Sequence, residues 1–393
     1  MKNTLFVLFS FAALIFSLQG CKKAVDPVVP SVNTPNMTQT VGFIETQVAL
    51  VAAFSPTATP AWHNVGAAGF STGQASYTSI NVYNGIPYAA YQDDAVPYKA
   101  TVMKYDGNSW AAVGSAGFSD GTASFISSYV YNGTPYVAYG DGAAGGKATV
   151  MMYNGSSWVN VGSAGFTPDT VGSMSLYVYN GTPYVAYMDN ANAGKASVMK
   201  YNGSAWVNVG TAGFSNGQAW FPVLSVSNGT PYVAYQDGSM GNRVNVMKFN
   251  TSAWEAVGPQ WFSNGAANYI SMYVDNDTPY VAFQDVADFL RLKVMKFNGI
   301  GWSPVGEAIS GGPAYNASIF VYNGTPYVAY EDYSYGMKAT VMKYVDNAWV
   351  TQGQAGFSAG IAETPSLFVY NAIAYVAYMD DANGYKATVM NCY

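Results

Sequence analysis

Residues 124–162 read SFISSYVYNGTPYVAYGDGAAGGKATVMMYNGSSWVNVG, and this stretch holds one complete structural repeat. Apolar runs that suit short strands occupy residues 126–131, 135–139, 147–153 and 158–161. Asn132-Gly133 separates the first two runs, and an Asn-Gly pair in that place indicates a tight hairpin because both turn residues need a positive φ. The stretch therefore predicts four short antiparallel strands.

Tryptophan marks the same point in seven such units. The seven residues are Trp62, Trp110, Trp158, Trp206, Trp254, Trp302 and Trp349. Their separation is 48 residues five times and 47 once, by subtraction of these numbers. The hairpin pair returns at Asn84-Gly85, Asn180-Gly181, Asn228-Gly229 and Asn323-Gly324. Four strands in each of seven equal units predict an all-β fold, a seven-bladed β-propeller of four-stranded antiparallel blades.

The two ends of this array complement each other. The chain ends on a predicted third strand, residues 386–392, whereas the array begins with an isolated fourth strand, residues 62–66. Pairing these strands would complete the last blade and remove the exposed sheet edges that invite aggregation. We therefore expect a closed ring over residues 61–393, and we expect that deleting residues 58–66 abolishes cooperative unfolding.

The composition limits the classes of function. Only 10% of residues are charged, while 16% are aromatic and 41 are glycine, which suits strands joined by tight turns. The balance of 16 Lys+Arg against 22 Asp+Glu offers no basic stripe, so we expect no nucleic-acid partner. Two cysteines and one histidine form no metal-binding pattern, and we expect neither a metal nor a cofactor. We expect Cys392 to be an unpaired thiol with a structural role.

Residues 1–20 are predicted to be an export signal. Lys2 precedes an apolar run over residues 5–18, which is too short to span a bilayer comfortably as a helix. Residues 21–60 are rich in Pro, Val, Thr and Asn and predict a tether between a membrane and the propeller.

The end of the export signal resembles a bacterial lipobox. Leu18-Gln19-Gly20-Cys21 carries the resemblance, and Gln19 departs from the small residue that is usual there. The resemblance implies that Cys21 is acylated and becomes the mature N-terminus. Because Lys22 rather than an aspartate follows, it also implies the bacterial outer membrane, facing either the periplasm or the outside. The alternative is ordinary secretion, with Cys21 free or paired.

Each unit also places an aspartate at the end of its second strand and a basic residue six positions later. The pairs are Asp93 with Lys99, Asp141 with Lys147, Asp189 with Lys195, Asp237 with Arg243, Asp285 with Arg291, Asp332 with Lys338 and Asp380 with Lys386. We predict exposed ion pairs across the base of each loop, which fix the strand register. The alternative is a ring of ligand-binding carboxylates.

The unit resembles the propeller superfamily of kelch and galactose-oxidase-like domains. A late tyrosine followed by tryptophan carries the resemblance, as in Tyr105 with Trp110 and Tyr153 with Trp158. The kelch Gly-Gly pair and the sialidase Asp-box are both missing. The resemblance, which spans about residues 61–393, therefore implies the architecture and not the activities of that superfamily.

Nucleophilic catalysis finds no support in the sequence. A serine recurs in the first strand of six units, at Ser79, Ser127, Ser175, Ser271, Ser318 and Ser366, and Val223 replaces it in the fourth unit. A small side chain suits a crowded strand near a central axis, whereas a nucleophile needs an adjacent base. The only histidine, His63, lies in the isolated strand. We therefore predict that the protein is not an enzyme and has no catalytic residues.

Aromatic residues that do not repeat are the candidate ligand-binding residues. They are Trp220, Trp261, Phe289, Tyr333 and Tyr335, which we place in the connections between second and third strands and between successive blades. These connections share one face of a propeller. Their flat apolar rings could stack on sugars or anchor a protein partner, and the alternative is packing between blades.

These features predict a binding protein anchored in the cell envelope, lectin-like or adhesive, that takes a glycan ligand. One alternative is a protein-interaction scaffold in an outer-membrane complex, and a third is a polysaccharide lyase that uses Tyr and Lys. We expect a monomer that touches the membrane only through its lipid. The repeat leaves open whether there is one site or up to seven weak equivalent sites, which would add avidity.

Overall fold

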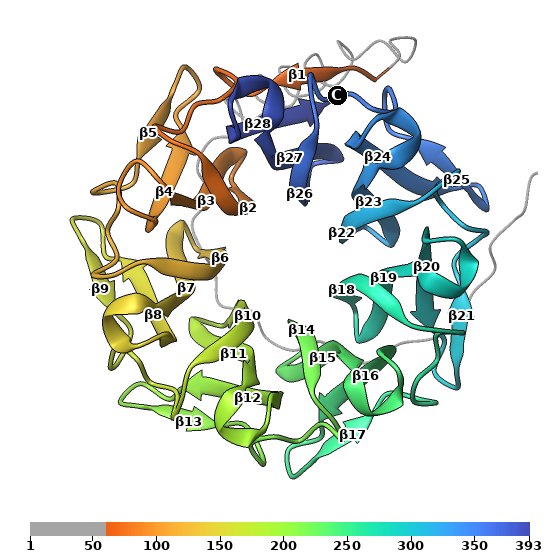
Figure 1. Ribbon diagram of the computed structural model, residues 1–393, viewed down its shortest axis with the longest axis horizontal. Helices are drawn as coiled ribbons and strands as arrows, with labels where there is room; N and C mark the ends of the chain where they lie inside the picture. Colours follow the sequence, from red (N-terminus) through yellow and green to blue (C-terminus); the bar gives the residue numbers. More distant parts are fainter. Residues whose placement is uncertain (1–59) are drawn as a thin grey trace, which may run out of the picture. The chain divides into compact units, whose positions relative to one another are not determined.

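The computed structural model describes residues 60–393, so the predicted signal peptide, the lipidation at Cys21 and most of the tether lie outside the described residues. Seven four-stranded antiparallel sheets surround a central channel (Figure 1). This arrangement confirms the seven-bladed β-propeller. Within the described residues no helix is long and apolar enough to cross a membrane.

Each blade runs outward from the channel in the order of its strands, except for the last. The inner strands are β2 (Ala75–Tyr83), β6 (Ala123–Tyr131), β10 (Val171–Tyr179), β14 (Ala219–Ser227), β18 (Ala267–Asp275), β22 (Ala314–Tyr322) and β26 (Ala362–Tyr370). The second strands are β3 (Ile86–Asp93), β7 (Thr134–Asp141), β11 (Thr182–Asp189), β15 (Thr230–Asp237), β19 (Thr278–Asp285), β23 (Thr325–Asp332) and β27 (Ile373–Asp380).

The outer half of each blade completes the sheet. The third strands are β4 (Lys99–Tyr105), β8 (Lys147–Tyr153), β12 (Lys195–Tyr201), β16 (Arg243–Phe249), β20 (Arg291–Phe297), β24 (Lys338–Val345) and β28 (Lys386–Cys392). The outermost strands are β5 (Trp110–Ala112), β9 (Trp158–Asn160), β13 (Trp206–Asn208), β17 (Trp254–Ala256), β21 (Trp302–Pro304), β25 (Ala348–Thr351) and β1 (Trp62–Asn64).

The ring is closed by its own first strand. β1 pairs antiparallel with β28, with Trp62 opposite Cys392 and Asn64 opposite Met390. Blade 7 therefore consists of β26, β27, β28 and β1, and the predicted closure is confirmed. Cys392 is fully buried at this junction and is a free thiol within the described residues.

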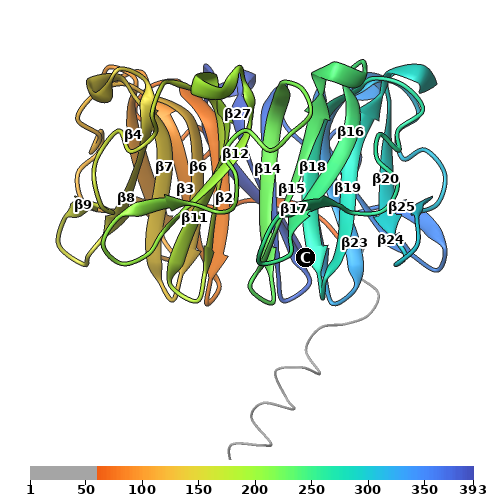
Figure 2. The ribbon, with the colours of Figure 1, turned by 90° about the horizontal axis from the view of Figure 1, so that it is seen from below.

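The two faces of the ring differ in their connections. Six short 3-10 helices lie on one face, here called the helix face, and tight hairpins lie on the other (Figure 2). The helices are η1 (Gly142–Ala144), η2 (Asn190–Asn192), η3 (Gly238–Met240), η4 (Val286–Asp288), η5 (Tyr333–Tyr335) and η6 (Asp381–Asn383). Asn132 and Gly133 have φ of 48° and 78°, which confirms the predicted hairpin turn.

The repeated tryptophans join neighbouring blades. The indole Nε1 of Trp110 donates to the carbonyl of Val65 in the preceding blade at 2.6 Å, and the ring stacks on Phe70 at 4.2 Å. The same N–H bond to the preceding blade recurs for all seven tryptophans. Each tryptophan therefore satisfies its polar group at the junction where its half-buried or buried ring packs between two blades.

The inner-strand serines make a second set of links between blades. Ser127 Oγ accepts a hydrogen bond from the backbone N–H of Leu176 at 2.9 Å, and Ser175 does the same for Leu224 at 3.0 Å. The link recurs at Ser79, Ser271, Ser318 and Ser366. The sequence indicated only a need for small residues, whereas the structure shows a hydrogen-bonding role.

The predicted ion pairs are wrong, although the predicted register is confirmed. Asp141 stands opposite Lys147 in the ladder, and the other six pairs are aligned alike. Among residues 60–393 no salt bridge joins Asp93 with Lys99, Asp141 with Lys147, Asp189 with Lys195, Asp237 with Arg243, Asp285 with Arg291, Asp332 with Lys338 or Asp380 with Lys386.

The aspartates turn inward instead. All seven are at most 3% exposed, and Asp141 Oδ1 accepts the N–H of Ala143 at 3.0 Å, which caps η1. Its Oδ2 accepts the hydroxyl of Thr149 at 2.9 Å. The unpaired N–H groups of the turn draw the carboxylate inward, because a buried capping bond stabilises more than an exposed ion pair.

Candidate functional site at the channel mouth

Each inner strand carries a β-bulge close to the helix face. The strand register shifts between Trp220 and Val223 in β14, for example, and between Asn268 and Ser271 in β18. The third residue of every inner strand, here called the bulge residue, lies inside this shift. The seven bulge residues are Tyr77, Phe125, Ser173, Phe221, Tyr269, Asn316 and Thr364.

Six of the seven bulge residues adopt the left-handed backbone conformation. Their φ values lie between 48° and 55°, and Ser173 is the exception. Glycine or asparagine is the ordinary occupant of this conformation, and a bulky side chain there is a genuine outlier. Phe221 and Tyr269 nevertheless hold it, at φ of 50° and 51°. Strain of this kind tends to persist at ligand-binding positions.

A cavity of about 260 Å³ opens among these residues, here called the channel cavity. Its walls come from the inner strands of blades 4 to 7 and consist of Phe221, Tyr269, Ile270, Asn316, Ala317, Thr364 and Pro365. Phe221 is 54% exposed although it is a large apolar residue. The cavity therefore combines an apolar surface with a few polar groups, which is typical of small-molecule sites.

A buried carboxylate supports the wall of the channel cavity. Glu331 in β23 is 3% exposed, and its Oε1 accepts hydrogen bonds from Asn316 Nδ2 at 2.6 Å and from the Thr364 backbone N–H at 2.9 Å. Burial raises the pKa of Glu331, although these two bonds act in the opposite direction. The carboxylate thus fixes two bulge residues of neighbouring blades.

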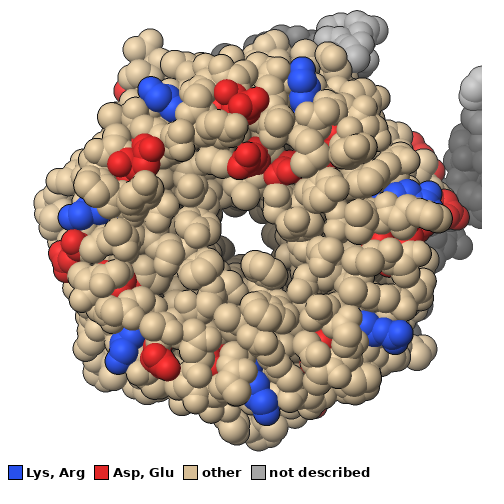
Figure 3. Space-filling view, viewed as in Figure 1, with Lys and Arg blue, Asp and Glu red and all other residues tan. Residues whose placement is uncertain are grey.

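Lys and Arg side chains on the helix face lie toward its outer rim, whereas acidic side chains lie both at the rim and close to the central opening (Figure 3). None of the lining residues of the channel cavity is basic. Within the described residues no three His, Cys, Asp or Glu side chains are grouped to hold a metal ion. The arrangement disfavours an anionic ligand and suits a ligand with an apolar face.

Two of the predicted binding residues lie beside the channel or between blades. Trp220 was expected in a connection, but it lies in β14, half-buried and immediately before Phe221. Trp261 lies in the connection from blade 4 to blade 5, where its Nε1 donates to Asp237 Oδ2 at 3.0 Å. Trp261 therefore donates to Asp237 in the way that the Thr149 hydroxyl donates to Asp141.

The other three predicted residues are exposed on the helix face. Phe289 directly follows η4 and is 83% exposed, while Tyr333 and Tyr335 belong to η5 and are 61% and 52% exposed. None of the five predicted residues lines the channel cavity. Their role in binding stays a prediction.

Sequence reasoning missed Phe221 and Tyr269. The first strand of the quoted repeat was predicted to begin at residue 126, so the position of Phe125, Phe221 and Tyr269 fell just outside the predicted strands, and alternation along a strand gives no sign of the bulge. One signal was available, because the third position of the inner strand holds an aromatic residue in four units, at Tyr77, Phe125, Phe221 and Tyr269. An aromatic residue that recurs next to the channel suggests an exposed ring.

Comparison with known proteins shows the fold only. No protein-family description matches the chain, and no curated protein matches it. The SapL1 lectin in complex with α-methyl fucoside is 16% identical, with a TM-score of 0.51 over 75% of this chain and 98% of the lectin. Polysaccharide lyase Uly1 is 9% identical, with a TM-score of 0.53 over 80% of this chain and 89% of the lyase. An ulvan lyase of a further polysaccharide lyase family is 14% identical, with a TM-score of 0.50 over 81% and 94% of the two chains.

Proposed function

We propose that this protein is a carbohydrate-binding propeller whose channel cavity holds a sugar ring. One observation carries the proposal: Phe221 stands 54% exposed, in a strained backbone conformation, at the wall of a cavity at the channel mouth. A strained and exposed aromatic residue costs stability, so a ligand that stacks on it is the simplest reason for its presence.

The polar groups of the channel cavity suit hydroxyl groups. Asn316 and Thr364 supply an amide and a hydroxyl, and Tyr269 supplies a phenol. Burial, together with the nearby Glu331, raises the pKa of Tyr269, so its hydroxyl keeps its proton near neutral pH and can donate. Sugar hydroxyls both donate and accept, and the C–H face of the ring can lie on Phe221.

We propose binding without catalysis. The only histidine, His63, lies in the outermost strand of blade 7 and stacks on Tyr393 at 4.7 Å, so it is not part of the cavity wall. Screening the protein against neutral and uronic-acid polymers tests this point. Release of unsaturated products would instead favour a polysaccharide lyase.

We also propose that the propeller is held at the outer membrane through a lipid on Cys21. The support is the lipobox-like stretch that ends at Cys21. Metabolic labelling with a palmitate analogue tests this proposal. Label should enter the native chain and be absent from Cys21→Ser.

Glycan-array binding of the full chain tests the carbohydrate proposal. The variant Phe221→Asn removes the aromatic ring but keeps a residue that tolerates the left-handed conformation, as Asn316 does in blade 6. We expect at least a tenfold loss of binding. The control is Phe125→Asn, which makes the same change at a bulge residue outside the cavity. Equal loss in both variants, or no retention of any glycan by the native chain, would refute the proposal.

A protein ligand is the second candidate, and the exposed Phe289, Tyr333 and Tyr335 favour it. Exposed aromatic residues on loops are typical anchors at protein interfaces. Changing all three to serine should release any partner that co-purifies with the native protein. The glycan array should be unaffected by this change.

A further inference from the structure

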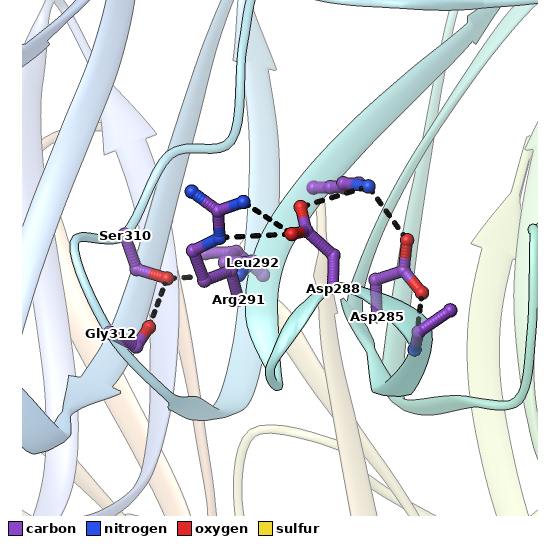
Figure 4. A network of polar contacts seen from close by, with 8 residues as sticks. Asp285, Asp288, Arg291, Leu292, Ser310 and Gly312 are labelled. Carbon is purple, nitrogen blue, oxygen red and sulfur yellow. Dashed lines mark hydrogen bonds and ion pairs between the residues drawn. The ribbon is translucent and has the colours of Figure 1, made fainter.

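Blade 5 departs from the repeat eight residues after its buried aspartate. In four other blades a hydroxyl at this place donates to the aspartate, namely from Thr149, Ser197, Thr340 and Thr388. Blade 5 has Lys293 instead, whose Nζ lies 2.8 Å from Asp285 Oδ2 and 3.0 Å from Asp288 Oδ2. Figure 4 shows Asp288 between Asp285 on one side and Arg291, which also bonds to it, on the other.

The connection that follows blade 5 is also different. Val305 to Ala314 is one residue shorter than the corresponding stretch from Val257 to Ala267. In blade 2 the equivalent connection closes over the blade, because Gly165 N–H donates to Thr149 Oγ1 at 2.9 Å. An ammonium group cannot accept such a bond.

A cavity of about 350 Å³ remains open beside Lys293, here called the blade 5 cavity. The lining residues that matter chemically are Phe262, Asn264, Asp285, Lys293, Met295 and Glu307.

The loop beside the blade 5 cavity carries more backbone strain than the equivalent loops with a 3-10 helix. Phe289 and Leu290 both have a left-handed backbone, with φ of 53° and 62°. The other five loops with a 3-10 helix place at least one glycine in the equivalent pair. Phe289 is 83% exposed and directly follows Asp288, which Lys293 holds. A strained and exposed aromatic residue in the loop between two lining residues, Asp285 and Lys293, is again typical of a binding position.

The charges of the blade 5 cavity select the class of ligand. Lys293 is already neutralised by two carboxylates, so an anionic ligand would compete with them and also meet the exposed Glu307. A cationic ligand would find Asp285 and Asp288 already bonded to Lys293, which leaves Glu307 as the single unpaired carboxylate of the lining. An uncharged ligand with adjacent hydroxyl groups can donate to Glu307 and accept from Lys293 or Asn264. Phe262 and Met295 offer apolar surface to its C–H groups.

We infer that the blade 5 cavity is a second, non-repeated binding site for an uncharged sugar with vicinal hydroxyl groups. It is separate from the channel cavity, because the two share no lining residue. The molecule has one such site rather than seven, because Lys293 and the shortened connection that follows it occur together only in blade 5.

Seven equivalent methionines allow a direct test in the full chain. Met295 lines the blade 5 cavity, and the same strand position holds Met103, Met151, Met199, Met247, Met342 and Met390 in the other blades. With methionine methyl groups labelled with carbon-13, glucose, galactose and mannose are titrated to tens of millimolar. We expect the Met295 signal to shift and the other six to stay in place. Glucuronic acid, in which a carboxylate replaces the hydroxymethyl group of glucose, should leave Met295 unshifted.

Variants locate the interaction. Lys293→Thr restores the residue type of other blades and should weaken the sugar-induced shift of Met295 at least tenfold, and Glu307→Gln should weaken it several-fold. Arg243→Ala, which removes a cation of blade 4, is the matched control and should change nothing. Phe221→Asn should also leave the Met295 shift intact, even if glycan-array binding is lost. The inference is overturned if no methionine shifts, if all seven shift together, or if Lys293→Thr binds as the native protein does.

Discussion

The outer part of each blade repeats the same side chains, whereas the mouth of the channel varies them from blade to blade. In every blade a buried aspartate caps its loop and a tryptophan bonds to the preceding blade, with the same geometry each time. Six of the seven bulge residues share a backbone conformation but not a chemistry, since they include Tyr77, Phe221 and Thr364. Repeated side chains hold the ring together, whereas a repeated backbone with varied side chains presents a surface for recognition.

Breaking the closure of the ring should have the largest effect. Deletion of residues 58–66 removes β1, and with it the Trp62 indole that stacks on Phe357 at 3.7 Å and donates to the Gln352 carbonyl at 2.8 Å. The open edge of β28 would then face solvent. We expect the cooperative transition in thermal or urea unfolding to disappear and the protein to aggregate. An unchanged transition would show that blade 7 does not need its fourth strand.

The buried aspartates should differ in cost according to their partners. Asp189 Oδ1 accepts the Ala191 N–H, and its Oδ2 accepts from Ser197 at 2.6 Å and Asn192 at 2.9 Å. We expect Asp189→Ala to lower the free energy of unfolding by about 2–4 kcal/mol, because a cap and buried hydrogen bonds are lost together.

Asp93 is the matched comparison for Asp189. Its Oδ2 is buried without a hydrogen-bond partner within the described residues, and burial raises the pKa of Asp93. Asp93→Ala should therefore cost about 1 kcal/mol less than Asp189→Ala. Urea unfolding of both variants measures the difference. Equal losses would mean that the Oδ2 bonds contribute nothing to stability.

Most of the fold was predictable from the sequence because it rests on local and periodic signals. The tryptophan spacing fixed the number of blades, and Asn132-Gly133 fixed the hairpin turns. The ends of the chain predicted the closure through β1. The predicted ion pairs do not form because strand register aligns the backbones and does not set the direction of the side chains. The Asp141 carboxylate accepts from a nearer donor in its own loop.

The candidate site was less predictable because it depends on non-local geometry. The channel cavity takes its walls from four inner strands that are far apart in the sequence. No pattern along one strand marks the bulge that turns Phe221 outward. The exposed Phe289 was predicted as a binding residue because it breaks the repeat. Lys293 also breaks the repeat, so a search for such departures among charged residues would have pointed to blade 5.

Glu331 lies between the outer part of its blade and the mouth of the channel, and its carboxylate makes the stability of this junction depend on pH. Gln92 and Gln284 occupy the same place in other blades, and their side chains donate to the Ala123 and Ala314 carbonyls at 2.7 and 2.6 Å. Glu331→Gln should donate likewise to Ala362 and keep the bonds from Asn316 and Thr364. We expect the variant to be about 1 kcal/mol more stable than the native protein at pH 7.

The pH dependence identifies the cause. Burial raises the pKa of Glu331 above 4.5, so the folded state prefers the protonated form. The contribution of Glu331 to stability is therefore fully present below pH 4.5 and is lost as the pH rises through the folded-state pKa. The advantage of Glu331→Gln should vanish at pH 4 and appear by pH 7 in urea unfolding. An advantage that is constant with pH would contradict this account, and Glu307→Gln, which removes a carboxylate that does not act on Glu331, controls for general loss of negative charge.

Val223 offers the smallest and most direct test of what repetition contributes. The inner strands of six blades carry a serine whose Oγ accepts a backbone N–H of the next blade, as Ser175 does for Leu224. Val223 stands at the place of this serine in blade 4. Val223→Thr keeps the branched shape and adds a hydroxyl opposite the Met272 N–H, so we expect a gain of about 0.5 kcal/mol in the free energy of unfolding. The reverse change, Ser175→Val, should cost about 1 kcal/mol, because the Leu224 N–H loses its partner. If Val223→Thr destabilises while Ser175→Val does not, the links between inner strands are held by packing alone and the hydroxyl groups are incidental.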